Sequence, residues 1–114
     1  MAISVSEREG VLIFRLSGRI ISQNATEVSE TIEEALASHS SSPNLVFDLK
    51  QVTAMDSSGL GVMIKTESII RPHNGQIAVI NVNKRVKNLI VMAHLITVFK
   101  NFESEDDAVA ALSQ

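Results

Sequence analysis

Two adjacent serines, Ser57 and Ser58, stand between an aspartate and two glycines in the stretch DSSGLG. A serine hydroxyl can attack a substrate, accept a phosphate from another enzyme, or cap a helix. As a nucleophile either serine would need a base and an oxyanion hole, and the adjacent Asp56 is a neighbour in sequence, which is seldom aligned for proton transfer. The chain contains no Gly-x-Ser-x-Gly elbow. We therefore expect no catalytic residue here and no enzyme activity.

The serines lie where a strand pattern gives way to a helix pattern. The stretch from Asn44 to Ile70 begins with the apolar run LVFDL, typical of a strand covered on both faces, and continues through a polar loop. Residues suited to a buried helical face then recur at helical spacing, at Leu60, Met63, Ile64, Thr66, Ile69 and Ile70. We predict a helix that begins close to Asp56, Ser57 and Ser58, whose side chains favour N-cap positions.

Gly59 and Gly61 occupy the first turn of this predicted helix. There each glycine costs about 1 kcal/mol of helix stability relative to alanine, and no Glu or Gln follows at capping-box spacing to offset the loss. Glycine leaves the backbone uncovered, so a large partner or a phosphate can approach the amide groups at the positive end of the helix dipole. Two interpretations stay open at this point: plain helix capping, and an exposed serine that another protein recognises.

Residues that would hold a metal or a cofactor are not grouped. His39, His73 and His94 are isolated, and none shows ligand spacing. The absence of cysteine excludes disulfides, thiolate catalysis and zinc-thiolate sites. The run Gly59-Leu60-Gly61 is neither a P-loop nor a dinucleotide fingerprint. We expect no metal site and no cofactor.

Length, composition and charge indicate how many domains the chain forms and which kinds of partner it could bind. A chain of 114 residues with 45% hydrophobic residues predicts one folded domain, 1–114, with a single core. A net charge of -3, four Phe and neither Tyr nor Trp argue against nucleic acid as a partner. The start MAISVSEREG lacks the blocks of a signal peptide, and the longest apolar run, Leu89 to Phe99, is too short to span a bilayer. We expect a soluble, cytoplasmic protein that does not bind membranes.

The first half of the chain predicts a hairpin followed by a helix. Ile3–Ser6 and Val11–Leu16 read as antiparallel strands around a Glu9-Gly10 turn, with Ser17-Gly18 ending the second strand. From about Ser22 a helix is expected, whose apolar stripe is Ala25, Val28, Ile32, Ala35 and Leu36. Its outer face carries Glu27, Glu30, Glu33 and Glu34. The following stretch, Ser38–Pro43, is expected to be a polar loop.

The second half of the chain repeats strand and helix patterns. Arg71–Gly75 should stop the central helix, and Gln76–Val82 reads as the next strand. A third helical stripe comprises Val86, Leu89, Ile90 and Ala93, behind a basic start of Lys84, Arg85 and Lys87. Val98–Phe102 predicts a last strand, and Ser104 with Asp107 predicts the N-terminus of a last helix with the face Ala108, Ala111 and Leu112. The alternation favours an α/β layer fold with a mixed sheet.

The central motif also carries a family resemblance. MDSSGLG after a VFDL strand resembles the signature of the STAS domain family, in particular the bacterial anti-sigma factor antagonists. The similarity spans nearly the whole chain, because an LSGRI segment and a late MAHLITVFKNFESEDDAVAAL segment stand in the matching order. The resemblance implies a STAS-like α/β fold with a mixed sheet of about four to five strands, an N-terminal antiparallel hairpin and about four helices.

The resemblance implies a phosphorylation-switched binding protein. An unphosphorylated anti-sigma factor antagonist binds an anti-sigma factor, typically itself a serine kinase, and thereby frees a sigma factor. The phosphorylated residue would be Ser57, the first serine after the motif aspartate, and a PP2C-type phosphatase would restore the hydroxyl. Asp56, Ser58, Gly59 and Leu60 would form the surrounding partner-binding surface, with Ser58 as a neighbouring cap.

One position departs from the family pattern. Members commonly carry an aspartate at the end of a Gly-x-Leu-Asp segment, where this chain has Ile21 after Gly18-Arg19-Ile20. The side chain of Ile21 cannot accept a hydrogen bond from a partner, although it could simply pack under the first helix. The change motivates an alternative function, a STAS adaptor or scaffold in a larger signalling assembly without a phosphate cycle.

Overall fold

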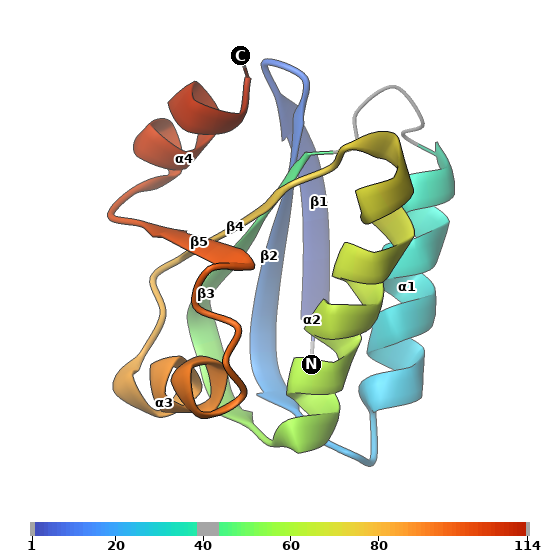
Figure 1. Cartoon of the computed structure of the whole chain (residues 1–114). Coiled ribbons are helices and arrows are strands. Elements are labelled where there is room, and N and C mark those ends of the chain that lie inside the picture. Colours follow the sequence, from blue (N-terminus) through green and yellow to red (C-terminus); the bar gives the residue numbers. More distant parts are fainter. Residues whose placement is uncertain (1, 39–43, 114) are drawn as a thin grey trace.

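The computed structural model describes residues 2–38 and 44–113, which form a five-stranded mixed sheet with helices on both faces (Figure 1). The elements in chain order are β1 (Ala2–Arg8), β2 (Val11–Ile20), α1 (Ala25–Ser38), β3 (Leu45–Met55), α2 (Ser57–Ile70), a 3-10 turn (Arg71–His73), β4 (Ile77–Ile80), α3 (Lys84–Met92), β5 (Phe99–Phe102) and α4 (Glu105–Leu112). The predicted fold class is confirmed. The loop predicted over Ser38–Pro43 lies outside the described residues, except for Ser38, which ends α1.

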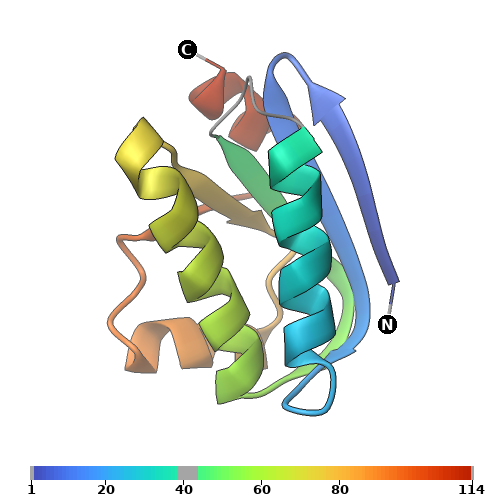
Figure 2. The same cartoon turned by 90° about the vertical axis from the view of Figure 1, so that its right-hand side faces the viewer.

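The strands lie in the spatial order β1-β2-β3-β4-β5. β1 and β2 pair antiparallel as the predicted hairpin, and the later strands pair in parallel. Because parallel crossovers are right-handed and each new strand is added on the same side of the last, the connecting helices fall on one face of the sheet. Figure 2 shows α1 and α2 side by side on that face. The final helix, α4, covers the opposite face (Figure 1).

β3 is buried on both of its faces, as its apolar sequence predicts. Leu45, Phe47 and Leu49 belong to the core cluster beneath α1, α2 and α3, whereas Val46 belongs to the cluster beneath α4. Burial on both sides explains why the run is almost continuously apolar. Packing on both faces therefore holds the strand in place, and Asp56, the residue after Met55, lies at a fixed position at the carboxyl end of this central strand.

The hairpin also anchors α4. Arg8 binds Glu105 at 2.8 Å and Asp106 at 2.6 Å, and Arg15 binds Glu105 at 2.7 Å. At the other end of the helix, the side-chain amide of Asn44 donates to the carbonyl of Leu112 at 2.8 Å. The acidic first turn of α4 suits the positive end of the helix dipole. These contacts fix an eight-residue helix that is too short to be stable alone.

The predicted ends of β2 and β3 are wrong. β2 does not stop at Ser17-Gly18 but continues to Ile20, because Gly18 adopts a φ of +82° and the register with β3 shifts there. The polar loop expected after the LVFDL strand is instead the second half of β3, which extends to Met55. Backbone pairing with β2 supports this half, so its polar side chains can face solvent while the strand persists.

The buried face of α2 also differs from the prediction. Ile64 and Ile69 are 41% and 37% exposed, whereas Val62, which was left out of the stripe, is 6% exposed. α1 packs along one side of α2, so the buried face is turned toward α1 and includes Val62. The positions that remain correctly predicted are Leu60, Met63, Thr66 and Ile70.

The last two helices follow their predictions with small corrections. Ala93 is the exposed C-cap residue of α3, and Ala111 is exposed on α4, where Val109 is buried in its place. The N-cap prediction for α4 is confirmed, because the hydroxyl of Ser104 accepts from the N–H of Asp107 at 3.1 Å.

The central helix, α2, ends as predicted, at a turn in which Asn74 adopts a left-handed φ of +62°.

Candidate functional site

The site is the junction at which β3 ends and α2 begins. Asp56 stands between the two elements in an extended conformation and is the N-cap of α2. Its Oδ1 accepts hydrogen bonds from the N–H groups of Ser58 at 2.9 Å and Gly59 at 3.1 Å. The helix start is thus confirmed, but Asp56 is the cap and Ser58 only donates its amide to it. The predicted role of Ser58 as a neighbouring cap is wrong.

Asp56 also ties α2 to the turn that precedes α1. Its Oδ2 accepts from the N–H of Ser22 at 3.2 Å, and its own N–H donates to the carbonyl of Ile20 at 3.4 Å. Asp56 therefore connects the end of β2 and the turn before α1 with the start of α2. The amide groups of Ser58 and Gly59 are used by this carboxylate, so the prediction that they stand open to a phosphate is wrong.

The charge state of Asp56 is set by these contacts. The N–H of Gly59, followed by those of Ser22 and Ser58, holds the pKa of the Asp56 carboxyl below its usual range, against an opposing effect of desolvation. A carboxyl whose pKa is lower in the folded state contributes stability that is complete above its unfolded pKa and is lost as the pH falls through the folded value. This contribution should therefore begin to fall below about pH 4 and be lost as the pH passes the lower pKa of the folded state.

The variant Asp56→Asn tests this assignment. The asparagine oxygen can still cap Ser58 and Gly59, but its amide group, a donor, would face the N–H of Ser22. We expect a melting temperature lower by a few degrees at pH 7 and a weaker loss of stability on acidification. Thermal unfolding measured by circular dichroism between pH 7 and pH 3 would show both effects. If the variant lost as much stability between pH 7 and pH 3 as wild type does, the stabilising role of the Asp56 charge would be contradicted.

The two glycines of the motif have different surroundings. Gly59 is buried, and a Cβ there would overlap the backbone oxygen of Ile20 and lie 2.6 Å from Cγ of Met55. The missing side chain at this position serves the close approach of α2 to β2, and a partner cannot reach it. At Gly61, which is exposed, an added Cβ would meet nothing within 4 Å. The expectation of an uncovered backbone holds for Gly61 alone.

The predicted partner-binding residues differ in exposure, as the two glycines do. Ser57 is exposed, Asp56 and Ser58 are partly exposed, and Gly59 and Leu60 are buried. Leu60 packs into the main core cluster and so supports the turn from below. Packing within the chain buries Gly59 and Leu60, and their part in a partner-binding surface stays a prediction.

Ser57 is the first residue of α2, and its side chain is accessible. Its hydroxyl forms no hydrogen bond with any residue in 2–38 or 44–113. The backbone around it is fixed, because the cap on one side and buried Gly59 on the other hold the first turn in place. The arrangement presents the Ser57 hydroxyl on a fixed backbone, which is what a modifying enzyme requires of its target.

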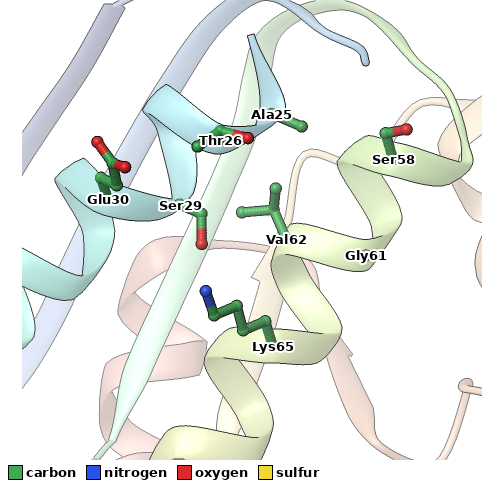
Figure 3. Close-up of a pocket in the computed structure, with 8 residues that line it drawn as sticks. All are labelled: Ala25, Thr26, Ser29, Glu30, Ser58, Gly61, Val62 and Lys65. Carbon is green, nitrogen blue, oxygen red and sulfur yellow. The ribbon is translucent and has the colours of Figure 1, made fainter. Parts of the chain in front are cut away.

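A groove lies beside the serines, between α1 and α2. It encloses about 270 Å³ and is lined by Ala25, Thr26, Ser29 and Glu30 of α1 and by Ser58, Gly61, Val62 and Lys65 of α2. Figure 3 shows the side chain of Val62 pointing toward α1 and Lys65 reaching toward Ser29. The sequence did not reveal this groove, because it depends on how two helices separated by β3 pack together.

Ile21 lies in the turn before α1, which begins at Ala25 and not at Ser22 as predicted. Its N–H donates to Oδ1 of Asn24 at 2.9 Å, and its carbonyl accepts from the N–H of Asn24 at 3.0 Å. The side chain of Ile21 is half-buried and is not part of the core cluster. The turn is therefore held by Asn24 and leaves Ile21 at the rim of the site.

The described residues contain no group of three or more His, Asp or Glu side chains that could hold a metal ion. His73 and His94 are exposed, and His39 lies outside the described residues. Within the described part of the chain, no helix combines the length and the apolar character needed to cross a membrane.

Comparison with known proteins places the chain in a family. Residues 2–108 match the STAS domain, and the chain belongs to the STAS domain family. The anti-sigma F factor antagonist of Paenibacillus polymyxa is 32% identical over 112 residues, which are 98% of this chain and 95% of that protein.

Solved structures share the fold. The crystal structure of an anti-sigma factor antagonist from Mycobacterium paratuberculosis has a TM-score of 0.86 and 26% identity, covering 99% of this chain and 94% of that one. The anti-sigma factor antagonist SpoIIAA in its unphosphorylated form has a TM-score of 0.81 and 16% identity, covering 96% of this chain and 95% of that one. The phosphorylated form of SpoIIAA from Bacillus has a TM-score of 0.75 and 15% identity, covering 96% of this chain and 98% of that one.

Proposed function

We propose that this chain is an anti-sigma factor antagonist whose unphosphorylated form binds an anti-sigma factor and so releases a sigma factor. The observation that carries the proposal is the exposed Ser57 hydroxyl on a first helical turn held rigid by Asp56. The names of the relatives support it, since the Paenibacillus protein is an anti-sigma F factor antagonist. The protein acts by binding and performs no catalysis itself.

The switch that we propose is phosphorylation of Ser57 by the anti-sigma factor, acting as a serine kinase, with reversal by a PP2C-type phosphatase. The partner would contact Ser57 together with the exposed parts of Asp56 and Ser58. A phosphate at Ser57 adds bulk and about -1.5 to -2 charge at the point of contact. No rearrangement of the fold is needed, because the Ser57 side chain already faces solvent.

The variant Ser57→Ala separates the phosphate acceptor from the binding surface. It should abolish phosphate incorporation by the kinase while leaving the affinity for the anti-sigma factor within about threefold of wild type, since a small exposed side chain contributes little contact energy. Radiolabelled phosphate transfer and calorimetric titration would measure the two effects.

Ser58→Ala is the matched control, because the two serines are adjacent and Ser57 is exposed whereas Ser58 is partly buried. This variant should still accept phosphate at Ser57. Phosphate found by mass spectrometry on the Ser57→Ala peptide would refute the assignment. A pull-down that recovers scaffold proteins and no kinase would favour the adaptor function that Ile21 motivates.

A further inference from the structure

Gly61 has no role in the fold that accounts for its missing side chain. It lies inside α2 with an ordinary helical backbone, and a Cβ there would meet nothing within 4 Å. Alanine would therefore fit at this position and stabilise the helix. Gly59, by contrast, is required by the backbone of Ile20. Packing within the described residues thus gives no reason for the missing side chain at Gly61, and a group outside the chain can approach the bare backbone there.

The groove between α1 and α2 lies directly beside Gly61, and it also begins at Ser58. Ala25 and Val62 give it apolar walls, while the hydroxyl-bearing side chains Thr26 and Ser29 lie along α1 (Figure 3). Its volume of about 270 Å³ is enough for one long side chain and not for a helix. The groove continues the surface on which Ser57 lies.

The charges along the groove determine which side chain it suits. Lys65 is paired with Glu33 at 3.3 Å, and Glu33 also accepts from the hydroxyl of Ser29 at 3.1 Å. Glu30 lines the groove and forms no ion pair with any residue that the structure describes. The exposed face of α1 carries further unpaired carboxylates within the described residues, at Glu27 and Glu34. The uncompensated charge at the groove is therefore negative.

We propose that this groove receives a lysine or arginine side chain of the anti-sigma factor. The partner chain crosses α2 at Gly61, the aliphatic stem lies between Ala25 and Val62, and the cationic end reaches Glu30. Long basic side chains suit such a path, because their stems cover apolar surface while the charge stays near solvent. This inference rests on the proposed function and names the chemistry of the partner at that site.

The experiment uses the anti-sigma factor kinase that phosphorylates this chain, titrated into the unphosphorylated protein. Gly61→Leu should weaken binding by roughly tenfold or more, because its side chain fills the crossing point. Glu30→Gln should weaken binding roughly fivefold and reduce its dependence on salt, since one exposed ion pair is lost. If Gly61→Leu does not fold by circular dichroism, Gly61→Ala replaces it.

Matched controls are Ser68→Ala on α2 and Glu34→Gln on α1, two exposed positions that do not line the groove. Both should bind as wild type does. Wild-type affinity in the Gly61 variant or in Glu30→Gln would overturn the proposal, and so would an equal loss in Glu34→Gln. If the wild-type chain itself fails to bind the kinase, the proposed function falls, and this outcome is distinguishable from a failure of the groove.

Discussion

Phosphorylation of Ser57 should weaken binding of the anti-sigma factor by more than about a hundredfold. The phosphate excludes the partner sterically from this turn. In addition, a partner carboxylate about 5 Å from the phosphate would form one pair of like charges, which costs roughly 3 kcal/mol at an effective dielectric near 20. The helix N-terminus cannot neutralise the phosphate through the amides of Ser58 and Gly59, because both already donate to Asp56. The added charge therefore faces the partner.

Calorimetric titration of the phosphorylated and unphosphorylated forms against the same partner would measure this effect. Ser57→Ala treated with the kinase is the control, and it should retain its affinity. Circular dichroism of the two forms should coincide, because the side chain of Ser57 is exposed. A loss of less than tenfold would show that the partner does not contact this turn.

Gly59→Ala should destabilise the fold by roughly 2 kcal/mol, the largest stability change that we expect from adding a single methyl group. The new Cβ would overlap the backbone oxygen of Ile20 and crowd Met55, and a backbone atom cannot move aside as a flexible side chain can. The better helix propensity of alanine offsets only about 1 kcal/mol of this strain. Urea unfolding followed by circular dichroism would give the difference in free energy.

Gly61→Ala provides the matched control, with the same chemical change two residues further along α2. We expect this variant to be more stable than wild type by up to about 1 kcal/mol, because nothing opposes the added methyl group. The two substitutions should therefore change stability in opposite directions. Equal effects would mean that the packing of the α2 start against β2 is not what requires Gly59.

The start of α2 and the buried half of β3 were predictable from sequence because their signals are local. A continuous apolar run predicts a strand covered on both faces, and β3 has core clusters on both sides at Phe47 and Val46. The change to helical spacing after Asp56 placed the helix start correctly. The motif left open whether its serines cap the helix or are exposed, and in the structure Asp56 is the cap while Ser57 is exposed.

The features that sequence did not predict depend on residues far apart in the chain. Gly59 and Gly61 are alike in sequence, and only the position of Ile20 beside one of them distinguishes their roles. The second half of β3 has no continuous apolar pattern. It is a strand because its backbone pairs with the extended end of β2. The exposure of Ile64 likewise follows from the place where α1 packs, which no local pattern in α2 records.

The central claim is that a partner docks on the first turn of α2 and is excluded by a phosphate there. Chemical-shift mapping on the nitrogen-15-labelled chain, with the anti-sigma factor added before and after phosphorylation, tests it most directly. We expect shift changes or broadening centred on Ser57, Ser58 and Gly61, and none after phosphorylation, with the remaining spectrum unchanged. A footprint on the α4 face, or one that persists in the phosphorylated protein, would contradict the account.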